Sequence, residues 1–289
     1  MVRKRDIMLG MGLFGVVGVI LVLALIMASS LTMQSSHIAH DSVGVVEITG
    51  VIYDSVPTNE TLKGMIDSDR IPVIVLRLNT PGGGVSASQE IYETVLKARD
   101  AGKIVIASMG SVAASGGYYI AAACDTIMAN PGTITGSIGV IANFSEISEL
   151  LDKIGVTMNV RKSGKFKDTG SISRKMSEEE EALIDSVIMD TYDQFVEAVA
   201  EGRNLDPSYV REYADGRVFT GRQARNLGFV DVFGTYQDAI DLAGELSGLG
   251  EDPPVYRDES NALWERMMDG ITSLGVRMMW LGMPQISYM

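Results

Sequence analysis

The sequence predicts an α/β fold in which helices cover a largely parallel sheet. Short apolar runs rich in valine and isoleucine alternate with longer segments whose apolar residues recur at helical spacing. Clusters of glycine and proline separate the two kinds of segment. The length of 289 residues suits one larger domain together with a terminal segment.

The expected strands share a short length and a content of β-branched residues. They are residues 43–49, 72–78, 103–108, 125–129, 136–141 and 156–161. Helices are expected at residues 86–101 and 115–124, the second after a glycine-bounded turn. A later helix begins with a capping box formed by Ser177 and Glu180, and it shows one apolar face through Ala200.

The N-terminus predicts a membrane anchor. Residues 7–28 are 22 uncharged apolar or small residues, enough to cross a hydrocarbon core of about 30 Å as a helix. A cleaved signal peptide is the alternative, although its apolar core usually runs over about 7–15 residues. Three basic residues precede the span and none follows before Lys63, so we expect a single-pass protein of the cell membrane with residues 1–6 cytoplasmic and the catalytic domain on the exterior side. The remaining divisions are a stalk at 29–42, a globular domain at 43–248, and a C-terminal amphipathic segment and tail at 249–289.

Charge, cysteine and histidine content exclude several classes of site. Residues 41–289 carry 21 basic and 36 acidic side chains, and this acidic balance argues against nucleic-acid binding. The single cysteine, Cys124, excludes an intrachain disulfide, and its neighbours of small size favour a buried structural thiol. The two histidines, His37 and His40, lie in the stalk, so the domain has no imidazole for a catalytic triad or a zinc site. We therefore expect no metal and no other cofactor, and a catalytic serine would need another base, such as lysine.

Three motifs are candidates for chemistry. Residues 79–84 (Asn-Thr-Pro-Gly-Gly-Gly) suit either an ordinary strand-to-helix turn or a site that presents backbone N–H groups. Ser115 precedes two glycines where a strand gives way to a helix, a position that suits either a nucleophile or an N-cap. Residues 161–168 (Arg-Lys-Ser-Gly-Lys-Phe-Lys-Asp) would by themselves form a solvated charged loop.

Taken in order, these motifs resemble those of the signal peptide peptidase SppA family. The matching blocks are residues 79–84, 109–119 (Met-Gly-Ser-Val-Ala-Ala-Ser-Gly-Gly-Tyr-Tyr), 135–140 (Thr-Gly-Ser-Ile-Gly-Val), 162–168 and 215–224 (Asp-Gly-Arg-Val-Phe-Thr-Gly-Arg-Gln-Ala). The resemblance covers roughly residues 43–245. It implies a Clp-protease/crotonase-like fold of repeated β-β-α units with an N-terminal transmembrane helix, assembled as a homo-oligomer.

The resemblance also implies a serine endopeptidase with a Ser-Lys dyad. On the matching blocks, Ser115 would be the nucleophile, Lys167 the general base, and Ser137 the residue that orients the lysine. The backbone N–H groups of Gly83 and Gly116 would form the oxyanion hole. The implied substrates are peptides, in particular signal peptide remnants.

A lysine base places a physical demand on its surroundings. Lowering its pKa from about 10.4 to about 7–8 requires desolvation worth on the order of 4 kcal/mol. Lys167, which the resemblance implies as the base in place of Lys165, is therefore expected to enter a dry site walled by Phe166 and a strand at 138–140. The adjacent Asp168 must point away, because a carboxylate within about 4–6 Å raises the pKa of an amine.

Several alternatives stay open at this point. A membrane protease of the NfeD type, a crotonase-like enzyme acting on acyl-CoA, and a scaffold that only binds peptides would share features of this sequence. The separation of 52 residues between Ser115 and Lys167 allows one chain or two chains to complete a site. The methionine-rich stripe of residues 261–279 is expected to face a core or another subunit. The uncharged end at 280–289 would pack on a neighbouring subunit or form a free or membrane-touching tail.

Overall fold

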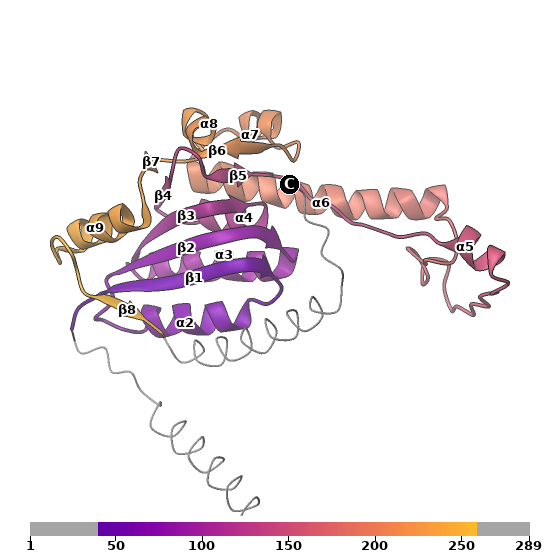
Figure 1. Cartoon of the computed structure of the whole chain (residues 1–289), viewed down its shortest axis with the longest axis horizontal. Helices are drawn as coiled ribbons and strands as arrows, with labels where there is room; N and C mark the ends of the chain where they lie inside the picture. Colours follow the sequence, from indigo (N-terminus) through magenta and orange to yellow (C-terminus); the bar gives the residue numbers. More distant parts are fainter. Residues whose placement is uncertain (1–39, 259–289) are drawn as a thin grey trace, which may run out of the picture. The chain divides into compact units, whose positions relative to one another are not determined.

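The computed structural model describes residues 40–258, of which residues 40–256 form one compact unit (Figure 1). The predicted anchor at 7–28 and the segment 259–289, with its methionine-rich stripe and tail, lie outside the described residues, as do residues 1–6 and most of the stalk. Within the described part of the chain, no helix combines the length and the apolar character needed to cross a membrane.

An eight-stranded sheet forms the centre of this unit. Its three long strands, β1 (Val43–Ile52), β2 (Val73–Gly83) and β3 (Ile104–Ala114), are parallel neighbours (Figure 1). The short strands are β4 (Thr126–Ala129), β5 (Ile134–Gly136), β6 (Val218–Thr220), β7 (Val232–Phe233) and β8 (Val255–Arg257). The order is β6-β5-β3-β2-β1-β8, with β4 beside β3 and β7 beside β4. Only β5 and β6 pair antiparallel among the pairings with a defined register in the described residues, so the predicted, largely parallel α/β sheet is confirmed.

Helices bury both faces of the long strands. Their bounds are α2 (Val56–Ile66), α3 (Val85–Asp100), α4 (Gly116–Ala122), α5 (Ser148–Lys153), α6 (Glu178–Arg203), α7 (Pro207–Tyr213), α8 (Gly221–Asn226) and α9 (Tyr236–Ser247). Val73 and Val75 of β2 pack in one cluster with Ile240 of α9. Ile74 and Leu76 are also fully buried, and they point to the opposite face because side chains alternate along a strand. A strand buried on both faces explains why residues 72–78 form a nearly continuous apolar run.

Several local predictions are confirmed. The expected helices at 86–101 and 115–124 correspond to α3 and α4. The capping box of α6 forms, because Ser177 Oγ accepts from the Glu180 N–H and the Glu180 carboxylate accepts from the Ser177 N–H at 2.9 Å. Cys124 is a buried free thiol whose pKa is raised by burial, as a structural cysteine should be.

One predicted turn and two predicted strands near the motifs are wrong. β3 continues through residues 109–114, where a turn was expected, because Val112–Ala114 pairs with β5. The strand expected at 136–141, including the wall at 138–140, ends at Gly136, where the backbone turns into a positive φ at Gly136 and Ser137. Residues 156–161 alternate in polarity, but they are exposed and are not a strand. The alternation of polar and apolar residues is a local pattern, and in the described structure no neighbouring strand pairs with this segment.

The arm, defined as residues 141–190, carries much of the apolar surface. Twelve of the twenty exposed large hydrophobic side chains in the described residues belong to it, including Ile141, Ile154 and Val187. Figure 1 shows α5 near the N-terminal end of α6, while the C-terminal part of α6 lies beside the sheet and α4. The apolar face predicted for α6 is therefore covered only in part: Phe195 and Val199 are buried, whereas Ile184 and Ile188 are only half-buried.

Candidate active site

Two pairs of glycines allow the end of β2 to lie against the start of α4. A Cβ atom at Gly83 would stand 2.1 Å from the carbonyl oxygen of Ile52. A Cβ atom at Gly82, whose φ is +99°, would stand 2.6 Å from the nitrogen of Gly116 and 2.8 Å from Cβ of Ser115. No side chain fits in either place, so residues 79–84 are more than an ordinary turn: they hold their backbone in contact with residues 115–116.

Ser115 occupies the strand-to-helix turn between β3 and α4 in a strained conformation. Its φ of 52° and ψ of −122° lie outside the regions that residues with a Cβ atom usually adopt. Although Ser115 stands at the N-cap position, its side chain makes no capping hydrogen bond. The N-cap interpretation is therefore wrong. Ser115 thus stands in a strained conformation on a sharp strand-to-helix turn, and its hydroxyl is not used to cap the helix.

The strain gives a prediction about stability. Ser115→Gly and Ser115→Ala both lack the hydroxyl and differ only in the Cβ atom that makes this φ unfavourable. We expect the glycine variant to be more stable by about 1 kcal/mol, since relief of the strain exceeds the added chain entropy of the unfolded state. Urea unfolding of the two variants measures the difference. Equal stability, or a more stable alanine variant, would show that the turn is not strained.

The structure brings both predicted oxyanion glycines to this turn. Gly116 is the first residue of α4, so its N–H has no acceptor within the helix. A Cβ atom at Gly116 would lie 3.3 Å from the nitrogen of Gly83 and 2.3 Å from Oγ of Ser88. The two backbone N–H groups thus belong to neighbouring segments beside Ser115.

Ser137 lies on the next segment of the same site. The Ser115 N–H donates to the carbonyl of Gly136 at 2.8 Å, and the Ser137 N–H donates to the carbonyl of Arg217 at 2.8 Å. Ser137 also has a φ of 52°. The bond to Arg217 places the block at residues 215–224, which stood apart in the sequence, directly beside the predicted orienting serine.

Ser115 lies where two clefts meet. One is lined by Gly83, Ser88, Tyr119 and Phe195. The other has a volume of about 550 Å³, and its lining includes Ser137, Val140, Ile188, Tyr192 and Asp215. Most of the side chains that line the two clefts are apolar, so Ser115 stands beside a largely apolar surface.

Lys167 does not reach Ser115 within one chain. Lys167 and Phe166 are exposed on the arm, and the neighbouring Thr169 hydroxyl hydrogen-bonds to Glu180 at the start of α6. Ile188 and Met189 of α6 line one of the two clefts that contain Ser115, whereas Lys167 lines neither of them. The structure therefore brings together Ser115, Ser137, Gly83 and Gly116, and leaves Lys167 and the expected wall residue Phe166 apart from them.

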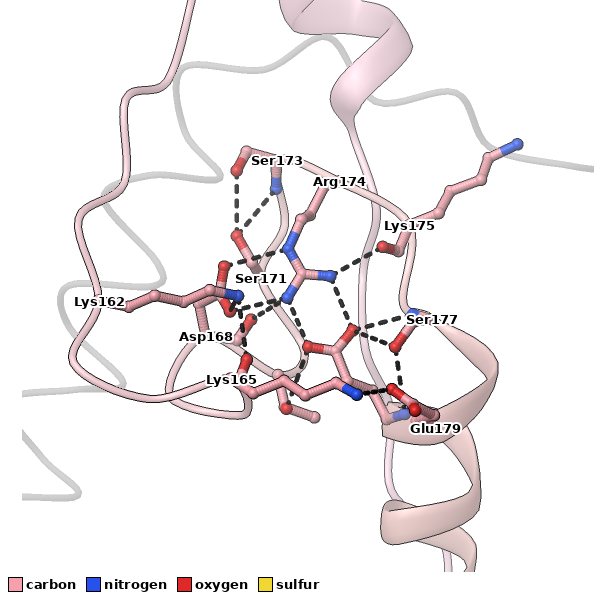
Figure 2. A network of polar contacts seen from close by, with 11 residues as sticks. Lys162, Lys165, Asp168, Ser171, Ser173, Arg174, Lys175, Ser177 and Glu179 are labelled. Atoms are coloured by element: carbon pink, nitrogen blue, oxygen red, sulfur yellow. Dashed lines mark hydrogen bonds and ion pairs between the residues drawn. The ribbon is translucent and has the colours of Figure 1, made fainter.

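A polar network that the sequence analysis missed fixes the loop around Lys167 (Figure 2). Asp168 accepts hydrogen bonds from Lys162 at 2.5 Å and from Arg174 at 2.8 Å. The same guanidinium reaches Glu180 at 2.5 Å. Two cations other than Lys167 thus occupy the Asp168 carboxylate, in agreement with the expectation that it is turned to other partners. Arg174 was missed because nothing in the spacing of a charged loop shows which carboxylates one arginine bridges.

Comparisons with known proteins identify the same blocks. The sequence profile of Peptidase family S49 matches residues 97–250, and that of Clp protease matches residues 47–133. A Synechocystis protein named as a candidate protease is 46% identical over 209 residues, which are 72% of this chain and 75% of that protein. A candidate signal peptide peptidase SppA of Enterococcus faecium is 43% identical over 180 residues, and Protease 4 of Salmonella typhi is 37% identical over 204 residues. These matches cover 62% and 70% of this chain, but only 52% and 33% of the two relatives, so the chain spans about half or a third of their length.

Proposed function

The chain belongs to peptidase family S49 and is a serine protease of the SppA type, and from this premise we propose that Ser115 is its nucleophile and Lys167 its general base. The observation that carries the proposal is the conformation of Ser115. It is strained, does not cap its helix, and lies against paired glycines at the meeting point of two clefts.

The lysine is supplied by a second copy of the chain. Within one chain Lys167 is exposed on the arm and lines neither of the clefts that contain Ser115. The exposed apolar side chains of the arm that line neither cleft, among them Ile154 and Val187, are the kind of surface that becomes buried in an obligate assembly. Docking of this surface on a neighbour carries Lys167 into the neighbour's cleft beside Ser137. The proposed Ser-Lys dyad therefore requires the proposed homo-oligomer, so the two form a single hypothesis.

The chemistry follows from this placement. The neutral amine of Lys167 takes the hydroxyl proton of Ser115, and Oγ attacks the carbonyl carbon of the scissile peptide bond. The negative charge that develops on the carbonyl oxygen is stabilised by the backbone N–H groups of Gly83 and Gly116. The ammonium of Lys167 then protonates the departing amine. In the second step the same lysine takes a proton from a water molecule, the oxygen of which attacks the acyl carbon, and the lysine returns this proton to Oγ of Ser115 as the C–O bond breaks. The hydroxyl of Ser137 orients the amine throughout.

The substrates are extended peptides with apolar side chains. The clefts on either side of Ser115 present Val85, Tyr119, Phe195 and Val140, which suit apolar residues next to the scissile bond. Residues 7–28 anchor the chain in the cell membrane with the catalytic domain on the exterior side. At the membrane, signal peptide remnants are the apolar peptides available as substrates.

Labelling with a serine-reactive fluorophosphonate tests the proposal. We expect the full-length chain to be labelled on Ser115, and labelling to be lost in Ser115→Ala while Ser111→Ala, an exposed serine four residues away on β3, is labelled as the unaltered chain is. A chain that binds peptides but takes up no label would be a scaffold that has kept the fold. Equal labelling of the Ser115→Ala variant would place the nucleophile elsewhere.

A further inference from the structure

We propose that Arg174 is a positioning residue for the base Lys167, an inference that rests on the proposed function. Its guanidinium fastens the loop of Lys167 to α6 and keeps the carboxylate of Asp168 away from the amine of the adjacent lysine. Arg174 touches neither the substrate nor the reacting atoms, so it acts only through Lys167.

One guanidinium joins two carboxylates from different segments (Figure 2). Nη2 and Nε of Arg174 donate to the two carboxylate oxygens of Asp168 at 2.8 and 3.1 Å. Nη2 and Nη1 donate to the two oxygens of Glu180 at 2.5 and 2.7 Å. Both contacts are bidentate, which an ammonium group cannot reproduce from a single position.

The far end of this clamp is rigid. The side chain of Glu180 is only 3% exposed, and its carboxylate also accepts from the Ser177 N–H at 2.9 Å as part of the capping box of α6. Arg174 holds the pKa of Glu180 at about 2, so this anchor stays ionised at any pH at which a lysine base operates. Arg174 therefore fixes Asp168, the residue next to Lys167, in position relative to α6.

The near end of the clamp controls a charge beside the base. The charged groups facing Asp168 are Arg174 and Lys162, and the exposed pair of Lys165 and Glu179 lies on the same loop and helix. Hydrogen bonds from Arg174, and next from Lys162, hold the pKa of Asp168 well below its usual range. The carboxylate is thus always charged, and if it were released toward Lys167 it would favour the ammonium form and disable the base.

The pH dependence of Ser115 acylation by a fluorophosphonate tests this inference in the full-length chain. We expect Arg174→Ala to move the midpoint of the acylation rate upward by about 1 pH unit, with a loss of about tenfold at neutral pH that is recovered at higher pH. Adding Asp168→Asn to this variant is expected to return the midpoint to that of the unaltered chain, because the carboxylate that favours the ammonium form is gone. The matched control is Arg211→Ala, which breaks an exposed ion pair with Asp193 of α6 and is expected to leave the midpoint unchanged.

A merely structural arginine would give a different result. Arg174→Ala would then lower the rate equally at every pH, and such a parallel loss overturns the inference, as does a shifted midpoint that persists in the double variant. If Arg174→Ala does not fold, the Asp168→Asn variant tests the inference instead. A midpoint of its acylation rate above that of the unaltered chain contradicts the role proposed for the Asp168 carboxylate. The proposed function fails separately, if Lys167→Ala is acylated at the rate of the unaltered chain.

Discussion

Ser115→Ala and Lys167→Ala are each expected to lower kcat/KM for peptide hydrolysis by about 10⁴-fold or more, whereas Lys165→Ala retains most of the activity. Removing the nucleophile or its base disables the dyad as a unit, and the residual rate then comes from the oxyanion hole and substrate binding alone. Lys165 is a matched control because it lies two residues from Lys167 on the same loop. Its ammonium is already paired with Glu179 on the exposed surface.

Steady-state hydrolysis of an apolar peptide by the three variants measures these effects. Each lysine variant should retain the melting behaviour of the unaltered chain, because Lys165 and Lys167 are both exposed in the single chain. Comparable losses in all three variants would contradict the assignment of the base. Full activity of Lys167→Ala would leave Ser115 without an identified base.

The sequence predicted the part of the fold that depends on local pattern. The apolar runs at 43–49, 72–78 and 103–108 are the cores of β1, β2 and β3, because strands buried on both faces need continuous apolar residues. The glycines at residues 82–84 and 116–117 were also informative. Only the structure, however, shows why four of them are glycines: a Cβ atom would meet backbone atoms of Gly116 at Gly82 and of Ile52 at Gly83, and the side chains of Ser88 at Gly116 and Thr80 at Gly117.

The arm could not be predicted in the same way. Residues 156–161 have the alternation of a strand, but their apolar side chains are exposed in the single chain and face no neighbouring strand. The apolar face of α6 was predicted correctly as a pattern, yet a pattern does not state whether the covering surface belongs to the same chain. Ile184 and Ile188 of this face are only half-buried within the single chain.

The site was predicted unevenly for the same reason. Ser115, Ser137, Gly83 and Gly116 lie on segments that the sheet brings together, so the order of motifs along the chain was enough to group them. The motif of Lys167 follows theirs in the expected order along the sequence, but Lys167 does not lie beside them within one chain. Arg174 carries no motif that the sequence analysis recognised, and its role depends on two carboxylates that lie six residues away on either side.

A lysine of one copy is proposed to serve the serine of another, and a mixing experiment tests this claim most directly. Ser115→Ala and Lys167→Ala chains, each inactive alone, are coexpressed with different tags and purified through both tags. Each site that combines an intact serine from one chain with an intact lysine from its neighbour should work. Such sites make up one half of those in a mixed dimer and about a quarter of those in a large ring, so we expect about a quarter to a half of the activity of the unaltered protein. If the mixed assemblies form but remain as inactive as either parent, the serine and the lysine must come from the same chain, and the hypothesis of a site shared between two copies is wrong.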